Sequence, residues 1–487
     1  MNFRGRNESR RVRARLLPAV LASALLLASA FAAGLARNAA AQTEDSLQPF
    51  GRTAAGPPRV VVADIDSGIN VYHSFFYAGG EPYKTAAPSS VTPEVLDAFG
   101  IDAAHQIELT RTGNFAADYA ADLSRVWANI RRGEPYWFKG TNVIAVSFVP
   151  GTRPVLPDDA DDTHGFGTAS AVVRANPEAV ILFVEGISDE SERYTFTHPE
   201  VDVVTTSYGI PGSVPVPAAV FGTEYTHLNQ SFYGVVNLGK LHFGAADNSP
   251  ALSPPDGTSG PWWSIGIAGF EEPTEGTTPA DTGSNGKQLL SGTLPDFVAD
   301  FTQSLPYCAD CEAGGFESVA GTSFATPRSA GTASKIVLEA RRALGHVGGM
   351  NYRSDTGEPS LVWGSGRRIT NWQVRRALEQ AAYFPRLAEY QPTTGAFELA
   401  GLPVLDPAPW ATVGWGVITT APSRDVVGQA LAALGVRGTL TRTKGADACA
   451  FMSAQVRARH LFWDNWVNSQ SNGFYFTGQD PYIYCGP

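Results

Sequence analysis

Ser323 is the first residue whose setting suggests chemistry. It lies in Gly321–Pro327 (GTSFATP), just before a long run of small and apolar residues. This pattern predicts a helix over 323–344 with the serine at its N-terminus, where Pro327 is tolerated because first-turn N–H groups have no partner within the helix. The free amides and positive dipole charge of that helix end suit a developing oxyanion. A helix N-cap serine would give the same pattern, so this segment alone leaves both interpretations open.

A serine nucleophile needs a base, and the base needs an orienting partner. Among the eight histidines, His164 is the one that opens a run of small residues entering a predicted helix over 164–174. Asp66 ends a β-branched, apolar strand predicted over 59–66, where a turn follows. A structural histidine and a turn aspartate are the ordinary explanations when each residue is taken singly. Their occurrence together with Ser323 favours a catalytic triad.

The elements around these residues predict an α/β fold. Further strands are predicted over 142–149, 179–184, 201–207, 240–246, 263–270 and 295–301, and further helices over 116–130, 230–238, 370–382 and 424–434. Strands that alternate with helices indicate a mostly parallel central sheet with helices on both faces. Such sheets place their sites at the carboxyl ends of strands, and Asp66, Ser207 and Asn248 all lie where a predicted strand ends.

These segments resemble the signature motifs of the subtilisin-like serine proteases (subtilases). Asp66-Ser67-Gly68 resembles the aspartate motif of that family, and His164-Gly165 with Ala169 resembles its histidine motif. Gly321–Pro327 matches its serine motif at every fixed position. The order Asp, His, Ser is that of subtilisin. The resemblance extends over about residues 59–435.

The resemblance implies a serine endopeptidase that works through an acyl-enzyme and needs no cofactor for its chemistry. Asn248 would donate its side-chain amide to the oxyanion, with the backbone N–H of Ser323 as the second donor. A substrate would bind as an added β-strand. A peptide ligase or cyclase on the same scaffold, or an inactive binding protein, are the alternatives. The residues expected to bind substrate are Ser207, Tyr208, Gly209, Ala245, Ala246 and Asp247.

Three positions depart from the family pattern. Phe166 replaces a threonine and Ser170 a glycine in the histidine motif, and Asp247 replaces the glycine before Asn248. A carboxylate at 247 would favour a basic residue in the substrate, or it would be a surface turn residue. Both interpretations stay open.

The N-terminus predicts export. A basic region, an apolar stretch over 16–35 and Ala39-Ala40-Ala41 have the pattern of a cleaved signal peptide, with a retained membrane anchor as the alternative. The predicted organisation is a signal peptide (1–41), a short N-terminal segment (42–58), a peptidase domain (59–435) with an insertion at about 74–140, and an aromatic-rich C-terminal appendage (436–487). We expect a secreted, monomeric protein that contacts no membrane after signal cleavage.

Four cysteines in an exported chain indicate disulfides. The simplest pairing joins Cys308 to Cys311 and Cys449 to Cys485, so that one disulfide closes the appendage. A zinc site at Cys308 and Cys311 is the alternative, although no second Cys-x-x-Cys accompanies them.

Charge limits the partners. Residues 42–487 hold 29 basic and 46 acidic residues, a net charge near −17. This balance argues against nucleic acid and favours protein or peptide substrates. Asp158, Asp159, Asp161 and Asp162 precede His164 and form either a structural calcium site or a solvated acidic loop.

Overall fold

The computed structural model describes a large part of the chain beyond residue 57. The described residues are 58–77, 90–151, 163–209, 223–246, 248, 257–270, 295–344, 346–351, 360–363, 368–369, 371–383, 398–399, 402–403, 414–418, 425–442, 449–450 and 452–454. The predicted signal peptide, the acidic run Asp158–Asp162, Asp247 and Cys485 lie outside them.

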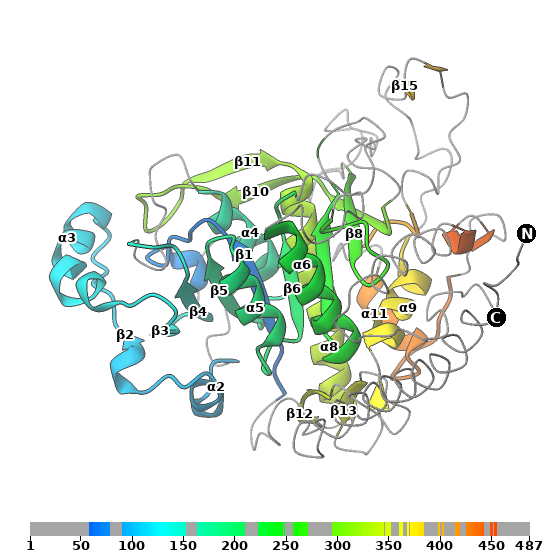
Figure 1. The fold of residues 1–487 in the computed structure, drawn as a ribbon, viewed down its shortest axis with the longest axis horizontal. Coiled ribbons are helices and arrows are strands. Elements are labelled where there is room, and N and C mark those ends of the chain that lie inside the picture. The colour runs from blue at the N-terminus through cyan, green and yellow to red at the C-terminus, as the bar shows by residue number, and fades with distance from the viewer. Residues whose placement is uncertain are drawn as a thin grey trace, which may run out of the picture. The chain divides into compact units, whose positions relative to one another are not determined.

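A nine-stranded sheet forms the centre of the fold (Figure 1). Its strand order is β2-β3-β4-β5-β1-β6-β7-β8-β9, and every neighbouring pair is parallel except β3 and β4. The strands are β1 (Val61–Asp66), β2 (Gln106–Ile107), β3 (Tyr136–Phe138), β4 (Val143–Ser147), β5 (Val180–Glu185), β6 (Val203–Thr206), β7 (Leu241–Ala245), β8 (Ile265–Phe270) and β9 (Phe297–Asp300).

Strand β1 is buried on both faces, which explains its nearly continuous apolar sequence. Val60 and Val62 belong to one apolar cluster, and Val61, Ala63 and Ile65 belong to another on the opposite face. Side chains alternate along a strand, so Asp64 and Asp66 face the same layer as Val62.

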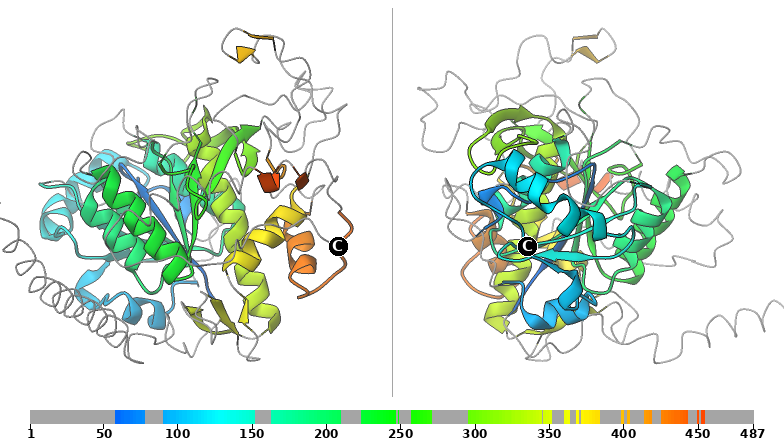
Figure 2. Two further views of the ribbon diagram at one scale, coloured as in Figure 1. Left: turned by 45° about the vertical axis from the view of Figure 1, so that its right-hand side comes forward. Right: turned by 90° about the vertical axis from the view of Figure 1, so that its left-hand side faces the viewer.

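Helices cover both faces of the sheet, as the sequence predicts (Figures 1 and 2). The layer that Val62 faces contains α4 (His164–Ala175), α8 (Thr322–Leu344), α9 (Asn371–Ala381) and α11 (Val426–Ala433). The opposite layer contains α2 (Pro93–Ala98) and α5 (Asp189–Thr197), and α6 (Thr223–Phe232) contacts α5. The mostly parallel α/β fold class is therefore confirmed.

One predicted helix is displaced. The sequence predicts a helix over 230–238, whereas α6 ends at Phe232 and continues as the π-helix η6 (Tyr233–Asn237). Gly234 in η6 packs closely against Phe196, because a Cβ there would lie 2.8 Å from the Phe196 ring.

The predicted insertion extends the sheet at one edge. Its described part contains α2, η4 (Ala103–His105), β2, α3 (Phe115–Arg125), η5 (Trp127–Asn129) and β3. Tyr72 joins it to the centre, since its hydroxyl donates to Asp122 at 3.0 Å and accepts from the Trp127 indole at 2.9 Å. The short helix η2 (Ser74–Phe76) lies at the start of the insertion.

Smaller elements complete the fold. They are the hairpin β10 (Thr302–Pro306) and β11 (Phe316–Ala320), the sheet of β12 (His346–Asn351), β13 (Ser360–Trp363) and β14 (Arg368–Ile369), and the pair β15 (Glu398–Leu399) and β16 (Leu402–Pro403). Cys449 and Met452, which belong to the predicted appendage, are buried in the main apolar cluster.

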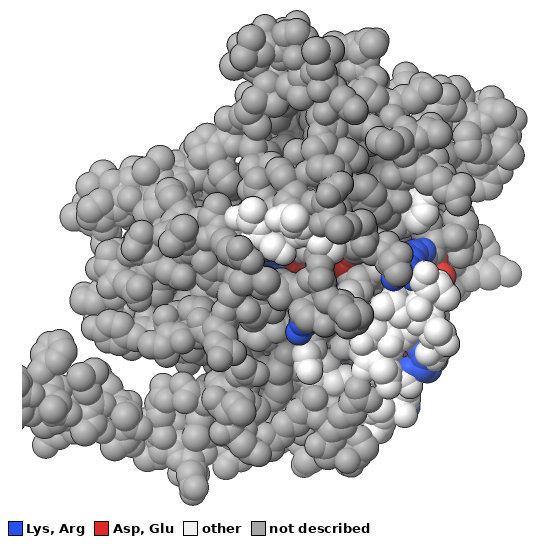
Figure 3. Space-filling view, turned by 90° about the vertical axis from the view of Figure 1, so that its right-hand side faces the viewer, with Lys and Arg blue, Asp and Glu red and all other residues white. Residues whose placement is uncertain are grey.

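Within the described part of the chain, no helix has both the length and the apolar character needed to cross a membrane. Charged side chains of the described residues form small separate groups on the face shown in Figure 3.

Candidate active site

The predicted acid and base are in contact. Asp66 is the last residue of β1, and His164 is the first residue of α4. His164 Nδ1 lies 2.8 Å from Asp66 Oδ1. The Asp66 side chain is 5% exposed and that of His164 is 34% exposed. A buried carboxylate thus orients an imidazole that solvent and a substrate can reach.

The turn after β1 holds Asp66 from the solvent side. The backbone N–H of Ser67 donates to Asp66 Oδ1 at 2.8 Å, and the Ser67 hydroxyl lies 3.2 Å from the same oxygen. These contacts fix the position of the Asp66 carboxyl group beside His164.

Gly165 brings α4 against this turn. A Cβ on Gly165 would lie 2.4 Å from the Gly68 carbonyl oxygen and 2.7 Å from the Phe183 ring. Any side chain at 165 would therefore push the helix, and with it His164, away from Asp66. This contact gives a physical reason for the glycine that follows the histidine.

Ser323 lies at the second position of α8, as predicted. Its hydroxyl donates to the Ser207 carbonyl at 3.2 Å, and the Ser207 hydroxyl donates to the Ser323 carbonyl at 2.8 Å. The ring of the next residue, Phe324, lies 5.5 Å from the His164 ring, centroid to centroid. The structure therefore brings the serine segment, the histidine and the end of β6 together.

Asn248 lies beside the same helix end. Its Oδ1 accepts the backbone N–H of Thr322 at 2.8 Å and the Thr322 hydroxyl at 3.0 Å. These bonds fix the amide orientation. A Cβ on Gly321 would lie 3.6 Å from Asn248 Nδ2 and 3.7 Å from the Ser323 nitrogen. The two predicted oxyanion donors therefore lie within 3.7 Å of the same point beside Gly321.

The residues expected to bind substrate lie at adjacent strand ends. Ser207, Tyr208 and Gly209 follow β6, while Ala245 ends β7 and Ala246 follows it. Asp247 lies outside the described residues, so its two interpretations stay open.

Tyr208 belongs to a polar network that the sequence does not indicate. Its hydroxyl donates to Glu192 Oε1 at 2.5 Å, and the other oxygen of Glu192 lies 2.7 Å from His227 Nδ1. Burial, followed by the Glu192 charge, raises the pKa of Tyr208 well above its usual range. Glu192 on α5 therefore holds Tyr208 in place within the segment 207–209 that is expected to bind the substrate.

Two further residues beside the triad were missed. Asp64 Oδ2 lies 2.8 Å from the Thr168 hydroxyl, which is 3.4 Å from Asp66 Oδ2. The available signal was an acidic residue at an inward position of an otherwise apolar strand.

The departures in the histidine motif are accommodated by packing. Phe166 is fully buried, with its ring 5.3 Å from His73 and 5.7 Å from Phe76. Ser170 is also fully buried on α4.

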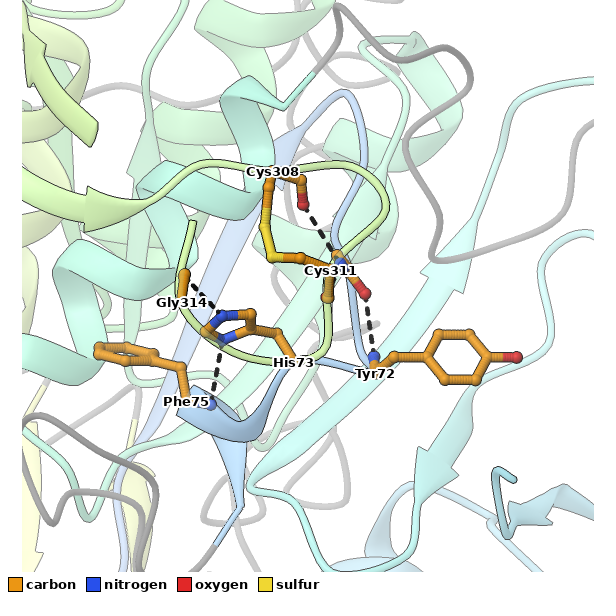
Figure 4. The surroundings of a disulfide bond; sticks show 7 residues. Tyr72, His73, Phe75, Cys308, Cys311 and Gly314 are labelled. Carbon is orange, nitrogen blue, oxygen red and sulfur yellow. Dashed lines mark hydrogen bonds between the residues drawn. A yellow bond between two sulfur atoms is a disulfide. The ribbon is translucent and has the colours of Figure 1, made fainter. Parts of the chain in front are cut away.

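Cys308 and Cys311 form a disulfide between β10 and β11, as predicted (Figure 4). This loop contacts the segment that follows Asp66. The Asn70 side-chain amide donates to the carbonyls of Cys308 at 3.2 Å and Cys311 at 2.7 Å. The Ser74 N–H donates to the Glu312 carbonyl at 2.7 Å. Cys449 also belongs to a disulfide, and its predicted partner Cys485 lies outside the described residues.

His73 lies beside this disulfide, yet the three side chains do not suit a metal. His73 Nδ1 accepts the Phe75 N–H at 3.1 Å, so Nε2 carries the proton and donates to the Gly314 carbonyl at 3.0 Å (Figure 4). Burial lowers the pKa of His73 to about 4, which keeps the ring neutral. Both ring nitrogens and both sulfurs are occupied, which disfavours the zinc alternative.

No protein-family model and no curated protein matches the chain. Solved structures do match. One is described as a lanthipeptide protease, at 14% identity and a TM-score of 0.43, covering 80% of this chain and 91% of that one. Another is the prenylagaramide maturation protease PagA, at 12% identity and a TM-score of 0.40, covering 78% and 94%. A third is a cold-adapted subtilisin-like serine proteinase, at 14% identity and a TM-score of 0.33, covering 67% and 82%.

Proposed function

We propose that the protein is an exported serine endopeptidase with Asp66, His164 and Ser323 as its catalytic triad. The observation that carries this proposal is the 2.8 Å contact between Asp66 Oδ1 and His164 Nδ1, with His164 packed beside the serine segment. All three residues lie at one end of the parallel sheet, where α/β proteins place their sites.

The chemistry follows from this arrangement. Ser323 Oγ attacks the scissile carbonyl carbon while His164 takes the hydroxyl proton, and Asp66 stabilises the resulting imidazolium. Asn248 Nδ2 and the Ser323 N–H donate to the oxyanion. The intermediate collapses when His164 gives its proton to the leaving amine, which breaks the C–N bond. Water then repeats the sequence on the acyl-serine ester and frees the carboxylic acid.

Substrate binding would use the chain after β6. An extended peptide would lie beside residues 207–209 and pair with their backbone groups, which places its scissile bond near Ser323. The substrate chemistry is therefore that of an unfolded protein segment or a peptide in extended form.

The test uses wild-type protein and the variant Ser323→Ala. Each is treated with a fluorophosphonate probe and then with casein. We expect the probe to label wild type only, and Ser323→Ala to lose turnover by about 10⁶-fold. The matched control is Ser318→Ala on β11, an exposed serine five residues earlier, which should label and cleave like wild type.

Labelling of Ser323→Ala, or a folded wild type that neither labels nor cleaves, would overturn the proposal. The second result would favour the inactive binding protein. Ligated rather than hydrolysed peptide products would favour the ligase alternative. Export is tested on its own by sequencing the N-terminus of secreted protein, which we expect to begin at Gln42.

A further inference from the structure

A second carboxyl group lies directly behind the proposed catalytic aspartate. Asp64 precedes Asp66 by two residues on β1, so both side chains face the α4 layer of the fold. Asp64 is fully buried. The mechanism above gives Asp64 no role.

Thr168 joins the two carboxyl groups. It lies four residues after His164 on α4, and therefore on the same face of that helix. Its hydroxyl oxygen is 2.8 Å from Asp64 Oδ2, 3.0 Å from the Gly165 carbonyl and 3.4 Å from Asp66 Oδ2. One hydroxyl can accept a hydrogen bond from one carboxyl group and donate to another acceptor.

The surroundings of Asp64 favour its neutral form. It pairs in register with Phe183 of β5 and adjoins Val62 in an apolar layer. Among the described residues, no donor reaches Asp64 Oδ1. Burial, followed by the charge of Asp66, raises the pKa of Asp64 well above its usual range. Two carboxyl groups this close do not both ionise readily.

Other ionisable side chains of the described residues lie around these two carboxyl groups. They are His164 on α4, Tyr208 after β6 and Glu185 on β5, which pairs in register with Asp66, while Glu192 of α5 contacts Tyr208.

We propose that Asp64 is a neutral carboxylic acid that positions Asp66 through Thr168. The acid O–H of Asp64 donates to Thr168 Oγ, and the Thr168 hydroxyl donates to Asp66 Oδ2. Asp66 then presents Oδ1 to His164 while Oδ2 is held from behind. The second link is the longer one, and the Gly165 carbonyl competes for the same proton. This inference rests on the proposed function, because it extends the proposed triad.

The test compares two pairs of variants. Thr168→Val removes the hydroxyl at nearly constant volume, and Thr168→Ser keeps it. Asp64→Leu removes the acid, and Asp64→Asn keeps a neutral donor. The readout is the rate constant of Ser323 labelling by a fluorophosphonate probe between about pH 5 and pH 9, which needs no known substrate.

We expect Thr168→Val and Asp64→Leu to label about three- to tenfold more slowly. The pH of half-maximal labelling should rise, because an Asp66 carboxylate with fewer donors holds the His164 imidazolium proton more strongly. Thr168→Ser and Asp64→Asn should restore most of the rate and the wild-type midpoint. Ser170→Ala removes another buried hydroxyl from α4 and is the matched control for packing.

A second measurement does not depend on activity. The Ser323→Ala protein should show an infrared carbonyl band of a protonated carboxylic acid at neutral pH, and the band should lose intensity in Ser323→Ala/Asp64→Asn. This infrared measurement also tests the protonation of Asp64 if the Asp64→Leu variant does not fold.

Two results would overturn the inference while the proposed function stands. One is Ser323-dependent labelling with the same rate and midpoint in Thr168→Val as in wild type. The other is an unchanged infrared band in Asp64→Asn, which would mean an ionised Asp64. A wild type that is never labelled would instead overturn the proposed function, and with it the positioning role.

Discussion

The two ends of the proposed triad are built differently. At the serine end, Ser323 and Asn248 are held by hydrogen bonds to backbone groups of Ser207 and Thr322, near the surface. At the aspartate end, Asp66 is almost fully buried and has side chains behind it. The loop that contains Cys308 and Cys311 supports the backbone that follows Asp66, through the side chain of Asn70.

This difference matches what each end has to do. The serine end must admit a substrate and form a new bond, so its groups are partly open and anchored by backbone atoms. The aspartate end must hold one charge in one place throughout the reaction, and a charge keeps its orientation best inside a packed, low-dielectric layer. Substitutions at the two ends should therefore differ in their effects on turnover and on stability.

The largest effect is expected from Asp66→Asn. The amide keeps the shape of the side chain but removes the charge that stabilises the His164 imidazolium. Turnover of casein should fall by about 10⁴-fold, with a circular dichroism spectrum like that of wild type. A loss of less than about tenfold would show that Asp66 does not orient the base.

Asn248→Ala should have the next largest effect, about 10²–10³-fold in kcat with little change in KM. The missing amide stabilises the transition state more than the bound substrate. The exposed Asn129 provides the control, since Asn129→Ala should leave both constants unchanged. A rise in KM alone would assign Asn248 to substrate binding.

The pH dependence of the unfolding free energy tests His73, which joins the segment after Asp66 to the loop of Cys308 and Cys311. Burial lowers the pKa of His73 to about 4, whereas the unfolded chain takes up this proton near pH 6.5. The unfolded state therefore gains a proton first as pH falls, and the native state loses about 1.4 kcal/mol per pH unit between these values. His73 should contribute this slope to the pH dependence of urea unfolding of Ser323→Ala protein.

The matched variant is Ser323→Ala/His73→Gln, which has no imidazole at this position. Its unfolding free energy should depend less on pH over the same interval, by about one proton. An equal slope in both proteins would show that His73 is protonated in the native state.

The smallest effect is expected from opening the Cys308–Cys311 disulfide. Replacing both cysteines by serine should lower the free energy of unfolding by about 2 kcal/mol, as the loop-entropy relation gives for so short a loop. Activity should fall less than in Asp66→Asn, because Asn70 and Glu312 still join the loop to the segment after Asp66. Chemical denaturation and casein turnover measure the two effects. An equal loss of activity in both variants would mean that the disulfide itself holds the aspartate end.

Much of the central sheet could be predicted because its strands are buried on both faces and therefore have apolar sequences. Helix α5 was missed because its sequence is polar. It forms from a capping box at Ser188 and packs through few apolar side chains, Phe196 among them. Strands β2 and β3 are two and three residues long and depend on their neighbours in the sheet for pairing.

The site divides in the same way. Asp66, His164, Ser323 and Asn248 stand in short motifs, and the structure places them at one end of the sheet. Asp64 precedes the aspartate motif and Thr168 occupies a variable position of the histidine motif, and an acidic residue in a strand and a threonine in a helix are ordinary when taken singly. Their 2.8 Å contact beside Asp66 is what distinguishes them as a pair.

The alternation of β1 has a consequence for insertions and deletions. Its odd-numbered residues from Val61 to Ile65 pack toward α2 and α5, and its even-numbered ones face α4 and α8. Removing one residue from 60–63 would keep the strand apolar, but it would turn the side chains of Asp64 and Asp66 to the opposite face of the sheet. Both carboxyl groups would then have to enter the cluster around Val95 and Phe196, far from any imidazole partner on α4. A library of this strand should thus tolerate many apolar exchanges and no change of length.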